Sequence, residues 1–404
     1  MGPSPDEVKE GAIRCMIGVM RQDIASLAAR LIAIDSVNPS LVPGAAGERA
    51  VAAFVAEHLR SIGARVEIVP AEGTADRPSV FGLLPGSGGG GSLLLYAHLD
   101  TVGTAGMRAP HDPEIEGDRL YGRGALDMKG SLAAVLATAG SCARSALMGD
   151  LAVAAVADEE GSSLGMEAVL RHMARIGYRP TAAIVTEPTD LRMCVAHRGF
   201  AWAAITTHGR ASHAALPGEG IDAIARMGRI LVGLEELDRS LQARPAHPLV
   251  GHGSVLATLI RGGSELFTVP AECRIDLIRR TLPGESVAGV REEIEGLLSG
   301  LGSRDPKFAA TFDLKLNRAP LEVPADSPIV AALSAAAKKV LGRPPVSFGA
   351  PYWTDAGLLA EAGIPTAIFG PSGEGLHSDV EWVSLASLDA LAGILTDAAA
   401  GFCG

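Results

Sequence analysis

Histidines and acidic residues follow several predicted strands of this sequence, where a side chain can reach into a cleft. His98 and Asp100 come directly after an apolar strand predicted at Leu93–Ala97. On extended backbone, residues two apart point to the same face. One of them can bind a metal through its imidazole while the other orients that ring. A His-x-Asp triplet is a weak signal by itself, so the interpretation depends on residues further along the chain.

Four further positions strengthen this interpretation, because ligands collect at the carboxyl ends of strands in open α/β sheets. They are Asp127, the pair Glu159-Glu160, Glu187 and His377. Two histidines and three carboxylates suit zinc or a similar metal. A bridging carboxylate can hold two such ions about 3.5–4 Å apart, the arrangement that activates water and polarises a carbonyl.

Each of these residues also has an ordinary explanation. An acidic run such as Asp158-Glu159-Glu160 usually faces water, Glu187 precedes a proline at a common kind of turn, and His377 alone fits a surface histidine. The functional interpretation requires one residue of the Glu159-Glu160 pair to bind metal while the other, free of metal, serves as general base. The metal hypothesis therefore rests on the whole set.

Two residues further along the chain could contact a substrate. His213, in the segment Gly209–Ala214, could donate to an oxyanion, or it could be an ordinary loop histidine. Arg280 could hold a substrate carboxylate through two parallel hydrogen bonds, or it could be a solvated charge at a strand end.

The predicted elements divide the chain into two domains, as its length of 404 residues suggests. Apolar strands without alternation, separated by helices, predict an α/β layer with a mixed sheet buried on both faces. From Gly199 the order becomes β-α-β-β-α-β, which predicts a small ferredoxin-like α+β domain inserted into the first. The expected boundaries are 1–21 (an N-terminal extension), 22–198, 199–316 (the insertion) and 317–404.

Composition limits the partners. The net charge of −11 argues against a nucleic-acid partner. The five cysteines are scattered and form no CxxC, which predicts a reducing, cytoplasmic location. The sequence shows no apolar run as long as a typical transmembrane helix, so no membrane partner is expected. Aromatic residues make up only 4% of the chain, so we expect a core of Ala, Val, Leu and Ile.

Taken together, these residues resemble the M20 family of metallopeptidases and amidohydrolases, in particular the group with acetylornithine deacetylase, succinyl-diaminopimelate desuccinylase and glutamate carboxypeptidase. The resemblance runs from about Asp23 to the C-terminus. It rests on five motifs in order: Ala97–Asp100, Gly122–Gly130, Asp158–Glu160, Thr186–Thr189 and His377.

The resemblance implies a site with two zinc ions per subunit, for which cobalt or manganese could substitute. His98, a bridging Asp127 and Glu187 would hold one ion, and Asp127, Glu160 and His377 the other. Asp100 would orient His98, and Glu159 would be the base. A cis peptide is implied between Asp127 and Met128.

The same resemblance implies that the inserted domain forms a homodimer. His213 would then enter the partner subunit's site, and Arg280 would hold the free carboxylate of the substrate. Two departures stand out. Phe267 occupies a position before Val269-Pro270 where the family often has Asn, and Val380 precedes Glu381 where the family commonly has Asn. The first removes an amide expected to touch the substrate.

The predicted function is therefore zinc-dependent hydrolysis of the amide bond in an N-acyl amino acid or a related small carboxylate substrate. One alternative is a carboxypeptidase or dipeptidase of the same family. Another is a non-catalytic binding protein on a hydrolase scaffold, although such a protein would not need a general base, Glu159, beside two metals.

Overall fold

The computed structural model describes residues 24–104, 106–145 and 147–404, which form two compact units. The second unit consists of residues 196–322 together with 349–353, and the first unit comprises the remaining described residues. The predicted insertion, 199–316, lies inside the second unit, which is a few residues longer at each end. The predicted N-terminal extension lies outside the described residues.

The first unit is built on a mixed sheet whose central strands are parallel. Its strand order is β1-β2-β6-β3-β7-β15-β8. The pairs β6–β3, β3–β7 and β7–β15 are parallel, whereas β1–β2, β2–β6 and β15–β8 are antiparallel. The strands are β1 (Arg65–Ala71), β2 (Thr74–Leu84), β3 (Leu93–His98), β6 (Leu151–Val156), β7 (Ala182–Val185), β8 (Met193–His197), β14 (Ser347–Ala350), which pairs with β8, and β15 (Thr366–Ile368).

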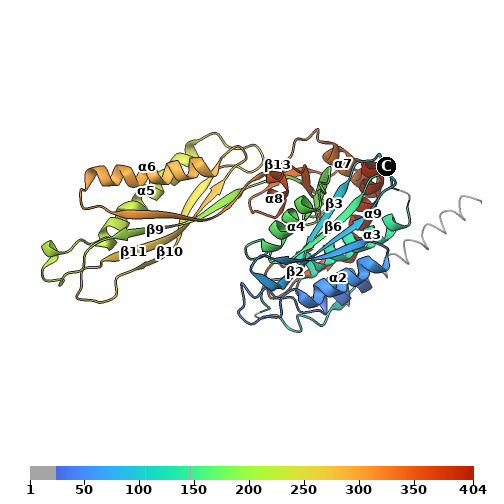
Figure 1. The fold of residues 1–404 in the computed structure, drawn as a ribbon, viewed down its shortest axis with the longest axis horizontal. Helices are drawn as coiled ribbons and strands as arrows, with labels where there is room; N and C mark the ends of the chain where they lie inside the picture. Colours follow the sequence, from blue (N-terminus) through green and yellow to red (C-terminus); the bar gives the residue numbers. More distant parts are fainter. Residues whose placement is uncertain (1–23, 105, 146) are drawn as a thin grey trace, which may run out of the picture. The chain divides into compact units, whose positions relative to one another are not determined.

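Helices cover both faces of this sheet, as the unbroken apolar strands predicted. All residues of β3 and β6 are buried. Helices α2, α3, α9 and α7 pack side by side over one face, and α4 and α8 pack together over the other (Figure 1). Their bounds are α2 (Arg49–Ser61), α3 (Gly130–Ala143), α4 (Leu164–Arg175), α7 (Pro328–Leu341), α8 (Ala356–Glu361) and α9 (Leu385–Cys403). The buried side chains are mostly Ala, Val, Leu and Ile, in line with the low aromatic content.

Helix α9 differs from the sequence-based expectation. Its length of 19 residues and mean hydropathy of 1.3 would allow it to cross a membrane by length and composition alone. Its buried residues, Leu388, Leu391 and Leu395 among them, lie in the layer formed with α3 and α7. The hydropathy is therefore that of a core helix packed between two other helices.

A small second sheet and a tight turn complete the first unit. The sheet has the order β16-β17-β5-β4, with β4 (Glu114–Glu116), β5 (Arg119–Tyr121), β16 (Gly373–Glu374) and β17 (Trp382–Ser384). Because β17 pairs with β5, it brings the segment around Glu381 next to the short helical turn η1 (Ala125–Lys129). The peptide between Asp127 and Met128 is cis, as the family resemblance implies.

The second unit has the predicted β-α-β-β-α-β order. Its antiparallel sheet runs β10-β11-β9-β12, the ferredoxin-like arrangement, and its two helices pack on one face over a core that includes Ile205, Ile230 and Ile275. The elements are β9 (Gly199–His208), α5 (Ala223–Ala243), β10 (Ser254–Gly262), β11 (Glu272–Thr281), α6 (Val287–Arg304) and β12 (Ala310–Arg318), with the short η2 (Pro217–Glu219) and β13 (Leu321–Glu322).

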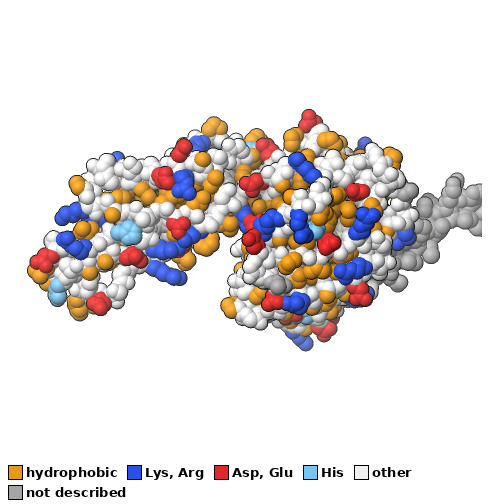
Figure 2. Space-filling model, viewed as in Figure 1, with side chains coloured by type: hydrophobic (Ala, Val, Ile, Leu, Met, Phe, Trp, Pro, Cys, Tyr) orange, Lys and Arg blue, Asp and Glu red, His pale blue; other side chains and the backbone are white. Residues whose placement is uncertain are grey.

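Figure 2 shows how charged side chains are distributed on one face of the molecule. On the face seen in Figure 2, lysine and arginine alternate with aspartate and glutamate on each unit, and no broad area of one sign is visible. A binding site for a polyanion normally needs a continuous basic surface, and this face does not present one.

Candidate metal centre

The ends of three neighbouring strands bring the predicted metal ligands together. His98 ends β3, Glu159 and Glu160 follow β6, and Glu187 follows β7. These three strands are parallel, so their carboxyl ends lie at one edge of the sheet. Asp127 from η1 and His377 from the loop after β16 reach the same place. We call the six residues His98, Asp127, Glu159, Glu160, Glu187 and His377 the carboxylate–histidine cluster.

Asp127 lies at the centre of this cluster, with one carboxylate oxygen toward each histidine. Its Oδ1 is 3.0 Å from Nε2 of His98, and its Oδ2 is 3.4 Å from Nε2 of His377. A carboxylate that presents separate oxygens to two imidazoles has the disposition needed to bridge two metal ions. The residues alone made Asp127 one of several candidate ligands, and the family resemblance implied its bridging role.

A glutamate completes each side of Asp127. On one side, Oε1 of Glu187 is 3.8 Å from Nε2 of His98. On the other, Oε2 of Glu160 is 3.1 Å from Nε2 of His377. The cluster therefore has two halves that share Asp127, and they match the two ligand sets implied by the family resemblance.

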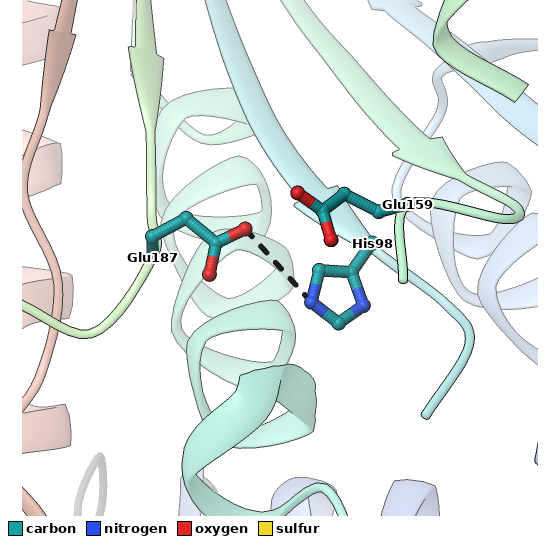
Figure 3. A group of neighbouring side chains, drawn as sticks. All are labelled: His98, Glu159 and Glu187. Atoms are coloured by element: carbon teal, nitrogen blue, oxygen red, sulfur yellow. Dashed lines mark ion pairs between the residues drawn. The ribbon is translucent and has the colours of Figure 1, made fainter. Parts of the chain in front are cut away.

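Glu159 lies beside the first half of the cluster. Figure 3 shows the carboxylates of Glu159 and Glu187 turned toward the space beside the His98 ring. Ligand atoms of these three residues lie within 4.8 Å of one another, as do those of His98, Asp127 and Glu160. The carboxylate of Glu159 therefore lies in the same group of side chains as the predicted ligands His98 and Glu187.

The concentration of carboxylates changes their acidity. Burial, followed by repulsion from neighbouring carboxylates, raises the pKa of Glu159, Glu160 and Glu187 above the ordinary value. Burial acts in the same direction on Asp127, but hydrogen bonds with the two histidines outweigh it and hold its pKa below the usual range.

The pKa values of the two histidines are also raised. Hydrogen bonds to Asp127 and then Glu160 raise the pKa of His377 to about 10. Burial disfavours the charged form of His98, yet the hydrogen bond to Asp127 and the surrounding carboxylates hold its pKa well above the usual value. Each shift reflects negative charge that lacks a fixed positive partner.

The cluster fits a pair of divalent cations. Oε1 of Glu160 and Oε1 of Glu187 are buried and have no hydrogen-bond partner among the described residues. Buried carboxylate oxygens are normally paired or bound to a metal. Imidazole nitrogen and carboxylate oxygen are the donors that zinc and related borderline metals take. Metal ions would satisfy both oxygens and neutralise the charge that shifts the pKa values.

Asp100 makes different contacts from those expected. Its carboxylate was predicted to orient His98, but Nδ1 of His98 lies 2.9 Å from the main-chain oxygen of Asp100 and 3.8 Å from the nearer carboxylate oxygen. The main-chain carbonyl therefore fixes the ring, leaving Nε2 toward the cluster. The carboxylate instead accepts the backbone N–H groups of Glu159 and Glu160, each at 3.1 Å.

Sequence reasoning missed the role of Glu381. This buried carboxylate accepts four hydrogen bonds, from the guanidinium of Arg123 at 2.7 Å and from the backbone N–H groups of Gly124, Leu126 and Asp127 at 2.8–3.0 Å. Arg123 also donates to the carbonyl of Ser378. The pair thus ties the turn that carries Asp127 to the loop that carries His377. The only sequence signal was the position of Glu381 four residues after His377.

His213 and Arg280 belong to the second unit. The His213 side chain is exposed, and its Nδ1 accepts the backbone N–H of Ala215 at 3.0 Å. The guanidinium of Arg280 is half-buried and stacks over the ring of Phe200 at 5.5 Å. Burial and the neighbouring positive charge of Arg198 lower the pKa of Arg280.

Comparison with known proteins extends these observations. The model for Peptidase family M20/M25/M40 matches residues 94–400. Acetylornithine deacetylase from Erwinia tasmaniensis is 29% identical over 398 residues, which cover 96% of this chain and 97% of that protein.

Two solved structures share the fold. An M20 family metallo-carboxypeptidase from Sulfolobus solfataricus matches with a TM-score of 0.74 and 16% identity, over 93% of this chain and 98% of that one. A dinuclear metal-binding peptidase of the M20 family from Bacillus subtilis matches with a TM-score of 0.71 and 18% identity, over 96% and 99% of the two chains.

Proposed function

The chain belongs to Peptidase family M20/M25/M40, and from this premise we propose that it is a deacylase that uses two zinc ions to hydrolyse the amide bond of an N-acyl amino acid. Metal-dependent amide hydrolysis follows from the family together with the carboxylate–histidine cluster. The proposal adds the substrate class, the number of ions and the metal.

The observation that carries the proposal is the position of Asp127 between His98 and His377, with a separate oxygen toward each. We assign His98, Asp127 and Glu187 to one ion, and Asp127, Glu160 and His377 to the other. Bound zinc ions would polarise the substrate carbonyl and make a water molecule more acidic. Cobalt or manganese would suit the same donors.

Glu159 is the general base in this proposal. Burial and Glu187 raise its pKa. Its carboxylate lies close enough to His98 and Glu187 to reach a metal ion, but we assign it to neither ligand set, which leaves it free to act as a base. It would take a proton from the attacking water and deliver it to the nitrogen of the leaving amine. A protein that only binds its ligand has no use for such a base, which argues against the non-catalytic alternative.

The second unit supplies the substrate contacts. We propose that it forms a homodimer interface and that His213, supplied by the second subunit, donates a hydrogen bond to the developing oxyanion. Arg280 would hold the free carboxylate of the substrate. No role is assigned to Phe267, which is exposed and precedes Thr268, the residue whose backbone pairs with that of His213.

We also place the enzyme in the cytoplasm. The described cysteines Cys142, Cys194, Cys273 and Cys403 are all buried, and none of these four forms a disulfide. Free thiols are typical of a reducing compartment.

The test is the release of amine from a panel of N-acyl amino acids and dipeptides, before and after removal of metal with EDTA. Hydrolysis of N-acyl amino acids that is lost with EDTA and restored by zinc supports the proposal. Faster hydrolysis of dipeptides would instead identify the peptidase alternative. If nothing is hydrolysed after zinc, cobalt or manganese is restored, the proposed function is wrong.

A further inference from the structure

We propose that Asn38 and Arg77 are positioning residues that hold Glu159 and Glu160 in place through the carboxylates of Asp100 and Asp158. This inference rests on the proposed function for the roles of the two glutamates. The residues involved form what we call the strand-end network, which consists of Asn38, Ser40, Glu48, Arg77, Asp100 and Asp158.

Arg77, on β2, is the only positive charge among the side chains of this network. Its Nε and Nη2 donate to the two carboxylate oxygens of Glu48 at 2.6 and 2.5 Å. Nη2 also donates to Oδ1 of Asp158 at 2.9 Å, and Nη1 donates to the hydroxyl of Ser40 at 2.9 Å. Arg77 is 6% exposed, and Glu48 and Asp158 are fully buried. Buried charges with this many partners hold their neighbours in a defined geometry.

Asn38 connects Arg77 to the strand end that carries Asp100. Its side-chain oxygen accepts from Nη2 of Arg77 at 3.0 Å, and its Nδ2 donates to Oδ2 of Asp100 at 2.8 Å and to Oδ1 of Asp158 at 3.1 Å. The backbone N–H of Asn38 donates to the carbonyl of Thr101 at 2.9 Å. Both the oxygen and the nitrogen of this fully buried side-chain amide therefore form hydrogen bonds.

Asp100 passes this constraint to the two glutamates. Its Oδ1 accepts the N–H of Glu159 and its Oδ2 accepts the N–H of Glu160. Oδ2 is also the atom to which Asn38 donates. The carboxylate thus holds two consecutive backbone N–H groups, one on the proposed base and one on a proposed metal ligand. A shift of Asp100 would move both side chains.

Asp158 fixes the turn from the other side. Its backbone has a φ of 64°, in the left-handed region that few residues with a Cβ adopt. Its side chain accepts from Arg77, Asn38 and Ser40, and its Oδ2 accepts the N–H of Ser162 at 3.2 Å. A Cβ at Gly161 would lie 2.5 Å from Oδ1 of Asp158, so the turn closes tightly on this carboxylate. The network therefore supports an uncommon backbone conformation directly before Glu159.

The placement of the network argues for more than stability. It draws on the turn before α2, on β2, and on the ends of β3 and β6, and it converges on two N–H groups that both belong to the cluster. Hydrogen-bonded partners behind metal ligands commonly change metal affinity or activity by about 10- to 100-fold when they are removed. If the network were purely structural, its removal would lower the stability of the protein but leave the metal affinity and activity of the folded protein unchanged.

The experiment compares N38A with wild type and with T138V as the matched control. Thr138 is fully buried in α3, and its hydroxyl donates to the carbonyl of Ala392, so T138V also removes a buried hydrogen bond of the first unit. Zinc affinity is measured on metal-stripped protein by competition with a fluorescent chelator, at a temperature where circular dichroism shows each variant folded. We expect N38A to weaken one of the two zinc-binding steps about 10- to 100-fold, and T138V to bind as wild type does.

Turnover provides a second measurement. With saturating zinc, N38A should lower kcat and leave KM nearly unchanged, because the substrate contacts are elsewhere. S40A is used if N38A does not fold. It removes one donor to Asp158 at a partly exposed position and should weaken the same zinc-binding step about three- to tenfold. The proposal is overturned if the folded variants bind zinc as wild type does and differ only in melting temperature. Because zinc titration does not need a substrate, a failure of the proposed amidase activity would leave this test intact.

Discussion

Replacing Glu381 by glutamine should destabilise the first unit by several kcal/mol without changing the size of the side chain. Oε1 of Glu381 accepts the N–H groups of Leu126 and Asp127 at 2.8 and 3.0 Å. Oε2 accepts from the Arg123 guanidinium at 2.7 Å and from the N–H of Gly124 at 3.0 Å. In E381Q, an NH₂ group replaces one of these two oxygens. Each oxygen accepts two hydrogen bonds, so in either orientation of the amide the NH₂ group, itself a donor, faces two donors that have lost their acceptor.

The magnitude follows from the two orientations. If the NH₂ group faces Leu126 and Asp127, two buried N–H groups lose their acceptor, at about 1–3 kcal/mol each. If it faces Arg123, the buried guanidinium loses its carboxylate, and breaking such a pair costs about 3–5 kcal/mol. We therefore expect the free energy of unfolding to fall by about 2–6 kcal/mol in the first orientation and by about 3–5 kcal/mol in the second.

The assay is urea unfolding of the metal-free protein followed by circular dichroism, with E374Q as the control. Glu374 is a solvent-exposed glutamate in the neighbouring strand β16, so the same change there should shift the free energy of unfolding by no more than about 0.5 kcal/mol. If the two units unfold separately, only one transition should move in E381Q. If the free energy of unfolding of E381Q falls by less than about 1 kcal/mol, the idea that Glu381 holds the turn around Asp127 in place is refuted.

Two further predictions concern pH and assembly. Burial raises the pKa of Glu160 and Glu187, and hydrogen bonds to carboxylates raise that of His377 to about 10. These groups bind protons more tightly in the folded state, so the stability they give is present at low pH and is lost as the pH rises through their folded pKa values. The melting temperature of EDTA-treated protein should therefore fall as the pH rises from about 6.5, the ordinary pKa of histidine, toward the folded pKa of His377. The gain in melting temperature on adding zinc should grow over the same range. A zinc gain that does not change with pH would contradict the assignment. If His213 acts in the partner subunit's site, mixing inactive E159A with inactive H213A should restore about a quarter of wild-type turnover. After random exchange about half of the dimers are mixed, and one of the two sites in each mixed dimer is complete. No recovery after subunit exchange would place His213 in its own subunit's site or outside the chemistry.

The residues of the cluster could be predicted because the signal is local. Each of His98, Glu159, Glu160 and Glu187 follows a short apolar strand, and parallel strands bring such ends together. The same reasoning predicted the ferredoxin-like order of the second unit. It missed β8, because Met193–His197 is a short strand that closely follows the turn after Glu187, with no helix to separate it.

The strand-end network could not be predicted from the sequence. Arg77 lies in the polar first half of β2, where no continuous apolar run indicates a strand. Asn38 precedes a proline in what the sequence suggests is an ordinary turn. Its contacts with Asp100 and Asp158 lie 62 and 120 residues away along the chain. Contacts of this range depend on the final packing of β2, β3 and β6, which no local pattern encodes.

The most direct test of the central claim is to measure bound metal and turnover in the same samples of wild type, E159Q and E160Q. If Glu159 is the base and Glu160 a ligand, E159Q should keep the wild-type metal content and lose turnover by about 10²–10⁴-fold. E160Q should lose one metal equivalent and turnover together. Two results would contradict this division of roles between the neighbouring glutamates. One is wild-type turnover in E159Q. The other is loss of metal from E159Q while E160Q keeps its full metal content.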